Sequence, residues 1–314
     1  MKIAWFTEGN WNGKVARTHP NMRNDSAWMC VLDAEHYCIN TPTCVIDEYD
    51  LGIITLPKNI SSISDKDNLI TELRKKCKKL AFMQEGPHWY FQDYKLEDQI
   101  WYYNTLSKMD ILFVHNVDDS FYYRGLFPNV RVERMTTLML TDNLALEDWT
   151  DRRSGVMIGG NMCSWYGGID SFIVAQEFNC EIYAPSMGRR IEREETLGIN
   201  HLPFMPWHQW MNELNKCKFA VHLMRTKAAG TFALNCAFLG VPCIGYGGID
   251  TQENCFPDLT IRDGDVVQAK KLANLLATDK IFYDECSQNA RMTYSSFDEI
   301  AFLHNFKVIY DSII

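Results

Sequence analysis

The sequence predicts an α/β protein with two domains, each built on an open parallel sheet. The chain has 314 residues, which is long for a single compact core and fits two domains. Hydrophobic residues make up 46% and charged residues 23%, as in globular proteins. Short apolar runs alternate with amphipathic segments, and this alternation is typical of strands joined by crossover helices. The alternation occurs twice, with a polar stretch between the two series.

The first series predicts an N-terminal domain over residues 1–140. Its apolar runs predict buried strands at Lys2–Phe6, Leu51–Leu56, Lys79–Met83 and Ile111–His115. Its amphipathic segments predict helices over Asp67–Lys78 and Leu96–Lys108. Residues 141–154 are polar and charged without a strand pattern, so we expect a linker there.

The second series predicts a C-terminal domain over residues 155–296. Its expected strands are Gly155–Ile158, Glu181–Tyr183, Phe219–Leu223 and Pro242–Gly245. Its expected helices are Ile169–Phe178, Gln209–Cys217, Gly230–Leu239 and Val266–Leu276. A last helix lies within residues 297–314 and is a candidate to pack back on the first domain.

Charge, cysteine content and hydropathy narrow the classes of function. The net charge of −9 does not suit indiscriminate nucleic-acid binding, which requires neutralising phosphates. The 11 cysteines form no C-x-x-C pair, so we expect packed thiols in a reducing cytoplasm, that of the host if the protein is viral. No apolar stretch approaches the roughly 18 residues of a membrane span. Oligomeric state is not predicted.

The segment from Gly230 to Ile244 (GTFALNCAFLGVPCI) carries a resemblance to a known family. It resembles the donor-site helix and strand of GT-B glycosyltransferases, in which a helix begins at a glycine-containing turn and ends at Gly-x-Pro before a strand. Trp210–Leu223 and Gly155–Gly168 resemble neighbouring parts of that nucleotide-binding domain. The resemblance implies two Rossmann-like domains facing across a cleft. It also implies transfer from a nucleotide sugar, UDP-linked in our expectation, without a metal or other cofactor.

Elementary electrostatics favour phosphate binding at the start of this helix. The helix start at Gly230 and Thr231 offers unpaired N–H groups and the positive end of the helix dipole. Arg225 and Lys227 precede it and are placed to neutralise a diphosphate leaving group. The candidate donor site also includes the loop after the first strand of this domain, at Gly159, Gly160 and Asn161.

The chain departs from the family at three donor positions. Many members carry two glutamates eight positions apart, where this chain has Lys227 and Asn235. Asn235 is a candidate to bond ribose hydroxyls, more weakly than a carboxylate would. Tyr166 stands near the place of a basic residue that the family often has. The identity of the sugar is therefore not predicted.

A long polar loop after the first strand is the candidate acceptor-binding or lid segment. The loop runs from Thr7 to Asn24. Loops of this length are uncommon inside compact domains and are often functional. The alternative is a disordered surface loop. Its candidate acceptor-binding residues are Glu8, Asn10, Lys14, Arg17 and His19.

Three residues are candidates for the base that an inverting glycosyl transfer requires. Glu85 and His88 follow the predicted strand Lys79–Met83, and Asp118 follows the strand Ile111–His115. Glu85 is the first choice because its position also resembles the base-bearing loop of phage DNA β-glucosyltransferases. The alternative for Asp118 and its neighbour Asp119 is a helix N-cap.

Other functions and two acceptor classes stay open. Asp263 and Asp265 have the spacing of a metal-dependent glycosyltransferase, although Asp265 also suits a helix N-cap. A nicotinamide or flavin enzyme would carry G-x-G-x-x-G, which this sequence lacks. A two-domain small-molecule binding protein without chemistry is a further alternative. The acceptor is either a glycan or small-molecule hydroxyl, or a hydroxymethylated base in phage DNA held by Lys14, Arg17, Arg23 and the basic run at residues 74–79.

Overall fold

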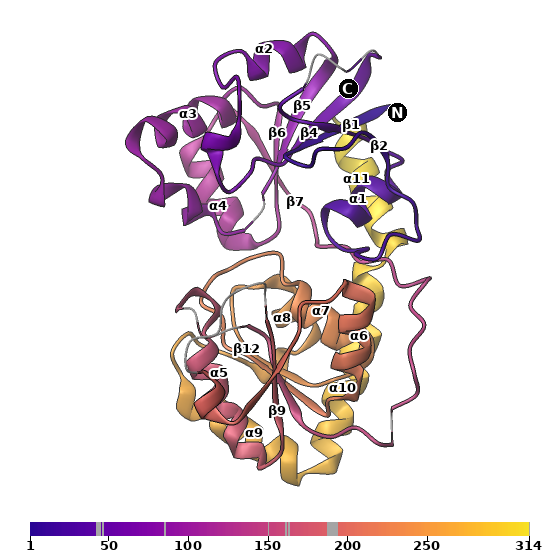
Figure 1. The fold of residues 1–314 in the computed structure, drawn as a ribbon, viewed down its shortest axis with the longest axis vertical. Coiled ribbons are helices and arrows are strands. Elements are labelled where there is room, and N and C mark those ends of the chain that lie inside the picture. The colour runs from indigo at the N-terminus through magenta and orange to yellow at the C-terminus, as the bar shows by residue number, and fades with distance from the viewer. Residues whose placement is uncertain are drawn as a thin grey trace. The chain divides into compact units, whose positions relative to one another are not determined.

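The chain folds into two compact α/β units (Figure 1). The computed structural model describes residues 1–41, 45, 47–84, 86–149, 151–160, 162, 164–186 and 194–313. Unit 1 comprises Met1–His19, Arg23–Leu140 and the chain from Glu299 onward, and unit 2 comprises Pro20–Met22 and Thr141–Asp298. Each unit contains a parallel sheet, which confirms the predicted fold class.

The described part of unit 1 contains a seven-stranded sheet in the order β2-β3-β1-β4-β5-β6-β7. Every neighbouring pair is parallel except β2 with β3. The strands are β1 Ile3–Thr7, β2 Gly13–Lys14, β3 Glu35–Cys38, β4 Tyr49–Ile54, β5 Cys77–Met83, β6 Ile111–Val114 and β7 Arg131–Arg134. The helices are α1 Asp25–Val31, α2 Leu69–Arg74, α3 Leu96–Leu106, α4 Val117–Leu126 and α11 Glu299–Asp311.

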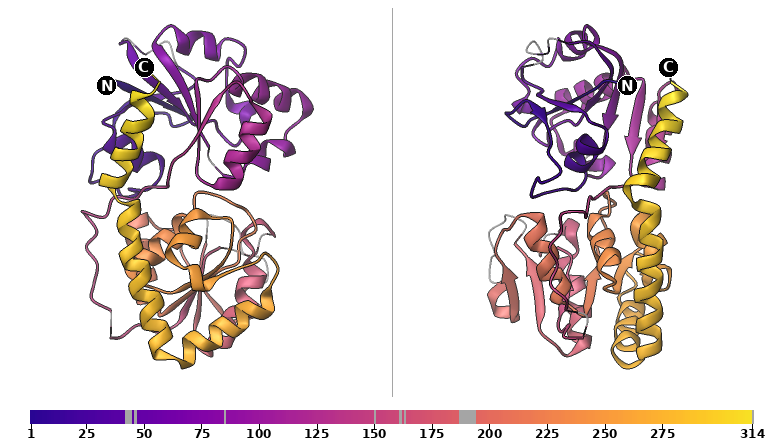
Figure 2. Two further views of the ribbon diagram at one scale, coloured as in Figure 1. Left: turned by 180° about the vertical axis from the view of Figure 1, so that it is seen from behind. Right: turned by 90° about the vertical axis from the view of Figure 1, so that its right-hand side faces the viewer.

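Helices cover both faces of this sheet because right-handed crossovers leave β1 in two directions. Helix α1 joins β1 to β3, whereas α2, α3 and α4 join the strands from β4 to β7. The C-terminal helix α11 lies beside α1 (Figure 2), where Phe302 packs edge-on against Trp28 with ring centroids 4.7 Å apart. Leu73, Leu106 and Phe127 belong to the core beneath the other helices. The end of the chain is thereby part of unit 1.

The described part of unit 2 contains a six-stranded, fully parallel sheet in the order β10-β9-β8-β11-β12-β13. The strands are β8 Val156–Ile158, β9 Ile182–Pro185, β10 Ile199–Leu202, β11 Phe219–His222, β12 Cys243–Tyr246 and β13 Thr260–Ile261. The helices are α5 Gly168–Ala175, α6 Trp207–Lys216, α7 Thr231–Leu239, α8 Asp250–Cys255, α9 Val266–Thr278 and α10 Lys280–Tyr294.

The strand order of unit 2 locates its ligand-binding position. Numbered from β8, the order is 3-2-1-4-5-6, the arrangement of dinucleotide-binding folds. Chain direction across the sheet reverses between β8 and β11, so the helices that follow these strands, α5 and α7, lie on opposite faces. In such sheets ligands bind where the strands end, beside the point of reversal. In this unit that point is the end of β8 and β11.

The polar stretch after unit 1 is attached to unit 2. The Nδ2 of Asn215 on α6 donates to the carbonyl of Glu147 at 2.7 Å, and Arg153 donates from Nε to the carbonyl of Asn215 at 3.0 Å. Backbone carbonyls and side chains of α6 therefore fix this stretch along its described length.

Two expectations about local structure are wrong. The helix predicted over Asp67–Lys78 ends early, because α2 stops at Arg74 and Cys77 already pairs with Tyr49 as the start of β5. The reading of Asp118 and Asp119 as a helix N-cap also fails, because Asn116 is the N-cap residue of α4. Among the described residues, no helix is long and apolar enough to cross a membrane.

Candidate functional sites at the carboxyl ends of the two sheets

In unit 2, a glycine turn and a histidine meet at the point where the strand order reverses. Gly159 follows β8, and its N–H donates to the carbonyl of Val221 in β11 at 2.8 Å. The ring of His222, the last residue of β11, lies against Gly159 so closely that a Cβ at this position would overlap it. A glycine is therefore required at Gly159. Gly159 and Gly160 are both buried, and the side chain of Tyr166 lies against Gly160. Asn161 lies outside the described residues.

The start of helix α7 is fixed in a geometry that only glycine adopts easily. Gly230 is the N-cap residue with φ +76°, and no side chain at this position caps the helix. Its carbonyl accepts a hydrogen bond from the Thr251 hydroxyl at 2.8 Å, and a Cβ on Gly230 would overlap that hydroxyl. The first N–H groups of a helix have no partner within the helix. The start of α7, with Thr231 partly exposed, therefore offers backbone donors to an anion.

Two cations from the loop between β11 and α7 lie in this part of unit 2. Arg225 donates from Nη2 to Asp170 Oδ2 on α5 at 3.2 Å, and the Arg225 side chain remains 60% exposed. The side chain of Lys227 lies against Gly248, just after β12. The predicted phosphate-binding cations thus extend from a loop that begins at the carboxyl end of the sheet, where anionic ligands of such sheets bind.

Asn235 has a packing role in the structure. It is 1% exposed, and its Oδ1 accepts a hydrogen bond from Nε1 of Trp207 on α6 at 3.3 Å. This burial argues against the ribose contact predicted for Asn235, because a ligand hydroxyl would have to displace the indole.

His222 is buried at the carboxyl end of β11 and was not predicted as a site residue. Its side chain is mostly inaccessible, and burial lowers its pKa from the ordinary 6.5 to about 4, so the ring is neutral at pH 7. No group in the described residues forms a hydrogen bond with its Nε2. Its position at the end of a predicted strand is the sequence signal that could have identified it.

The lowered pKa of His222 makes the stability of unit 2 depend on pH. Above pH 6.5 the ring is neutral in both folded and unfolded chains, and it contributes no pH dependence. Below that pH only the unfolded chain gains the proton, so the free energy of unfolding falls until about pH 4. We expect His222 to account for a loss of about 3 kcal/mol between pH 7 and pH 4.

Chemical denaturation across this pH range measures the effect. We expect the His222→Asn variant to show a flatter pH dependence than the wild type. His304→Asn is the matched control, since His304 is exposed on α11 in unit 1. Equal pH dependence in the wild type and His222→Asn would show that the folded protein protonates His222 normally.

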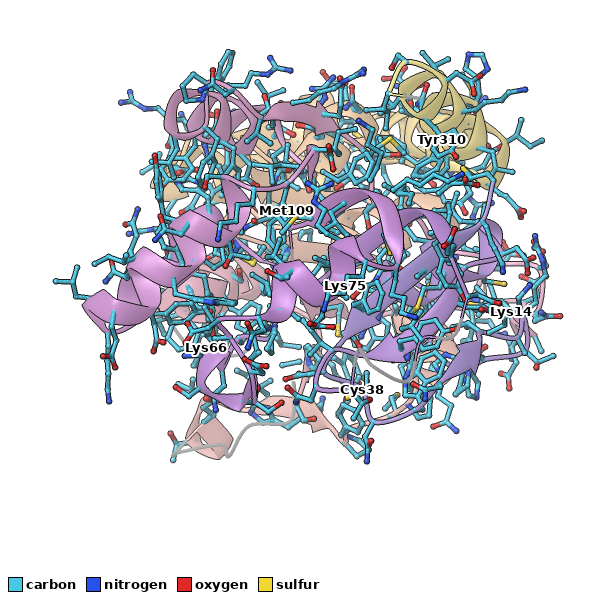
Figure 3. All side chains as sticks on the ribbon, turned by 90° about the horizontal axis from the view of Figure 1, so that it is seen from above. Lys14, Cys38, Lys66, Lys75, Met109 and Tyr310 are labelled. Carbon is cyan, nitrogen blue, oxygen red and sulfur yellow. The ribbon has the colours of Figure 1, made fainter. Side chains whose placement is uncertain are left out.

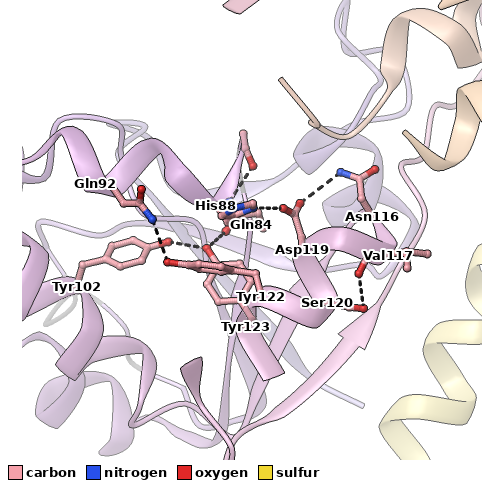
Figure 4. Close-up of polar contacts among 11 residues, drawn as sticks. Gln84, His88, Gln92, Tyr102, Asn116, Val117, Asp119, Ser120, Tyr122 and Tyr123 are labelled. Carbon is pink, nitrogen blue, oxygen red and sulfur yellow. Dashed lines mark hydrogen bonds and ion pairs between the residues drawn. The ribbon is translucent and has the colours of Figure 1, made fainter. Parts of the chain in front are cut away.

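In unit 1, His88 and Asp119 are brought together beyond the carboxyl ends of β5 and β6 (Figure 4). Nδ1 of His88 lies 2.7 Å from Asp119 Oδ1, and Asp119 is 1% exposed. Asn116 donates from Nδ2 to the other Asp119 oxygen at 3.3 Å. The His88 ring stacks on Tyr122 with centroids 4.1 Å apart. Stacking on Tyr122 therefore sets the plane of the imidazole ring, and the contact with Asp119 holds its Nδ1.

This pair has the geometry of a general base with an orienting carboxylate. An ionised carboxylate only accepts, so Nδ1 of His88 donates to Asp119, and in the neutral imidazole Nε2 then carries the lone pair. The His88 side chain is 26% exposed, which gives a ligand access to the ring. Such a nitrogen can take a proton from a hydroxyl placed beside it.

A buried polar chain supports the loop that carries His88. Tyr123 donates to Gln84 Oε1 at 2.5 Å, and its oxygen lies 3.2 Å from that of Tyr102 (Figure 4). Gln84 in turn donates from Nε2 to the carbonyl of Gly86 at 2.8 Å. The chain between β5 and His88 is thereby tied to α3 and α4. A recess beside it is lined by Leu56, Pro57, Lys58, Phe82, Gln84, Pro87, Tyr90, Phe91, Tyr94 and Tyr102.

Of the two other candidate bases, Glu85 and Asp118, the structure describes only Asp118; Glu85 lies outside the described residues. Asp118 is exposed in the first turn of α4, and its neighbour Asp119 is the carboxylate that contacts His88. Asp118 and Asp119 are adjacent, and packing decides that Asp119 turns inward while Asp118 stays exposed.

The described part of the loop after β1 is ordered by a buried histidine. His36 is fully buried in β3; its Nδ1 donates to the carbonyl of Trp11 at 2.9 Å, and its Nε2 lies 2.7 Å from the Thr7 hydroxyl. The Trp11 ring stacks on His36 with centroids 3.7 Å apart. Burial lowers the pKa of His36, which favours this neutral state. The alternative of a disordered loop therefore fails here.

The described contacts of the five candidate acceptor residues in this loop are with different partners. All are exposed. Glu8 and Asn10 follow the end of β1. Lys14 lies opposite Glu35, at the start of β3, and pairs with Asp33 at 2.6 Å. Arg17 forms an ion pair with Glu299, and His19 lies in a turn closed by its N–H on the Ala16 carbonyl.

Asp263 and Asp265, the acidic pair of the metal-dependent alternative, lie just before helix α9. Asp265 is the N-cap residue of α9, and its carboxylate accepts from the N–H of Gln268 at 2.9 Å. This outcome confirms the N-cap interpretation of Asp265. Within the described ranges, no three His, Cys, Asp or Glu side chains are grouped so that they could hold a metal ion.

Solved structures that resemble this chain decide its fold. HepE from Anabaena in complex with UDP-glucose matches with a TM-score of 0.70 and 12% identity over 99% of this chain and 100% of HepE. The chain has the fold of the GT-B glycosyltransferases. Sucrose-phosphate synthase from Thermosynechococcus elongatus matches with a TM-score of 0.67 and 11% identity over 100% and 99% of the two chains.

Longer proteins match this fold over part of their length. The pneumococcal O-GlcNAc transferase GtfA in complex with UDP and GlcNAc matches with a TM-score of 0.62 and 10% identity, over 90% of this chain and 61% of GtfA. This chain therefore spans about three fifths of the length of GtfA. The match to the GtfA/B complex likewise covers 59% of the GtfA/B chain that it aligns with. No protein-family model matches the sequence, and neither does any curated protein.

Proposed function

We propose that this protein is a glycosyltransferase that transfers a sugar from a UDP-sugar bound by unit 2 to a hydroxyl group bound by unit 1. The observation that carries the proposal is the likeness to HepE, which covers both chains almost completely and whose structure contains UDP-glucose. The uncapped start of α7 and the cations of unit 2 support it independently, because they supply what a diphosphate needs.

In the proposed donor site, unit 2 binds the diphosphate through backbone and side-chain donors. The uncapped start of α7 at Gly230 supplies N–H groups and the positive end of a helix dipole. Arg225 and Lys227 supply the positive charge that stabilises the diphosphate as it leaves the sugar. In this proposal the protein itself neutralises the leaving group.

In the proposed acceptor site, His88 removes the proton from the acceptor hydroxyl. Asp119 holds the imidazole with Nε2 as the free base and stabilises the imidazolium that forms. The acceptor oxygen then attacks the anomeric carbon, the bond to the diphosphate breaks, and UDP leaves with the bonding pair. Glu85, for which the structure gives no position, stays the alternative base.

The acceptor that the charges favour is a glycan or small-molecule hydroxyl. The cations predicted to line a DNA-binding cleft are largely paired with carboxylates, which leaves less charge for phosphates. Figure 3 shows Lys14 and Lys75 at separate places on unit 1. The ion pairs are Lys14–Asp33, Arg17–Glu299, Arg74–Asp110, Lys75–Glu72, Lys78–Asp50 and Lys79–Asp110.

The position of the basic run also argues against a DNA acceptor. Residues 74–79 lie at the start of β5, whereas His88 lies beyond its end. A strand of this length separates its two ends by about 20 Å. A base extruded from DNA bound along the run would therefore not reach His88 directly.

A turnover screen tests the proposed function. The protein is incubated with a panel of UDP-sugars and either neutral oligosaccharides or hydroxymethylated DNA, and the products are identified by mass spectrometry. We expect UDP release coupled to a mass increase of one sugar on an oligosaccharide acceptor. Transfer to DNA alone would refute the acceptor assignment, and absence of both UDP binding and turnover would refute the function.

A further inference from the structure

Asp170 stands at the centre of a small polar cluster in unit 2 that no step above has used. It lies in the first turn of α5, the helix that follows β8. Its Oδ2 accepts from Arg225 Nη2 at 3.2 Å and from the Tyr246 hydroxyl at 3.4 Å. Three separate elements, namely α5, the loop after β11 and the end of β12, thus meet at one carboxylate oxygen.

The three side chains differ in how firmly they are held. Tyr246 is completely buried, and the Asp170 side chain is 22% exposed. Arg225 is 60% exposed and is the long, flexible member of the cluster. The buried phenol therefore fixes the carboxylate, and the carboxylate fixes one end of the guanidinium.

We propose that Asp170 is a positioning residue that holds the Arg225 guanidinium ready for the diphosphate of the donor. This inference rests on the proposed function. Through this contact Arg225 reaches α5, the helix that follows the first strand of unit 2.

Asp170 and a diphosphate need not compete for Arg225. A guanidinium carries five N–H donors in a rigid plane, and the ion pair with Asp170 uses Nη2. In the described part of the chain no group forms a hydrogen bond or ion pair with Nε or Nη1, which leaves their donors for phosphate oxygens. Fixing a long side chain before the ligand arrives removes an ordering cost from binding. Charge alone predicts that Asp170 weakens diphosphate binding, because a carboxylate beside an anion site repels the ligand.

The test is calorimetric titration with UDP and with uridine, which lacks the diphosphate. We expect Asp170→Asn to weaken UDP affinity about three- to tenfold and to leave uridine affinity unchanged. Tyr246→Phe, which removes only the hydroxyl, should cause a smaller loss in the same direction. Asp258→Asn is the control, since it removes an equal charge from an exposed residue just before β13.

A double-variant cycle separates positioning from a merely structural role. If Asp170 acts through Arg225, Asp170→Asn causes no further loss of UDP affinity in an Arg225→Ala background. Tighter UDP binding by Asp170→Asn, equal losses for UDP and uridine, or an undiminished loss in the Arg225→Ala background would each overturn the inference alone. A wild-type protein that fails to bind UDP would overturn the proposed function and this inference with it.

Discussion

Replacement of His88 by alanine should lower turnover with a UDP-sugar by about a hundred- to ten-thousandfold, the range that a general base contributes. UDP affinity should stay unchanged, because His88 belongs to unit 1 and the proposed donor site to unit 2. Asp119→Asn should cause a large loss as well, since an amide can donate to Nδ1 and favour the wrong tautomer. Initial rates at saturating donor, with calorimetry of UDP binding, measure both effects.

Two further variants make the assignment of the base falsifiable. Asp118→Asn changes the exposed neighbour of Asp119 and should retain turnover. Glu85→Gln tests the base that the sequence ranked first. Loss of turnover in Glu85→Gln together with near-normal turnover in His88→Ala would transfer the role to Glu85 and leave the His88–Asp119 pair structural.

Replacement of Arg225 by alanine should weaken UDP affinity by about ten- to a hundredfold, the worth of hydrogen bonds to a charged group. Uridine affinity should not change, because the proposed contact is with the diphosphate alone. Lys271→Ala is the matched control: it removes a cation from the exposed face of α9 in the same unit. Equal UDP affinities for the wild type and Arg225→Ala would remove Arg225 from the donor site.

The central strands and several helices could be predicted because each forms a local run of apolar residues or an amphipathic pattern in the sequence. Ile111–Val114 is a four-residue apolar run and forms β6 as expected. The short strands β3 and β7 were not predicted, because they mix polar with apolar residues and are fixed by pairing with β1 and β6. Tertiary pairing of this kind leaves little trace in a local window.

One long helix was missed although a local signal for it exists. Helix α10 spans Lys280–Tyr294, and the preceding Asp279 accepts from the N–H groups of Ile281 and Phe282. An aspartate before a segment of good helix formers is a recognised helix start. Phe282, Cys286 and Ala290 also recur at the spacing of a helix face, so the sequence carries both signals.

The candidate donor site was easier to predict than the candidate base. Gly230, Arg225 and Lys227 lie within six positions of one another, so a single motif brought them together. His88 and Asp119 lie 31 positions apart and meet only because β5 and β6 are neighbours in the sheet. Asp170 and Arg225 are 55 positions apart and likewise meet only in the fold. Contacts of this kind follow from strand order, which the sequence did not specify.

Amide hydrogen exchange with and without UDP locates the nucleotide most directly. UDP should slow exchange at the first residues of α7, Thr231 to Ala233, because their N–H groups lie at the proposed phosphate position. The same amides should respond less in Arg225→Ala at equal UDP concentration. Slowed exchange confined to other parts of the chain, or no change at these amides under saturating UDP, would contradict the donor site described here.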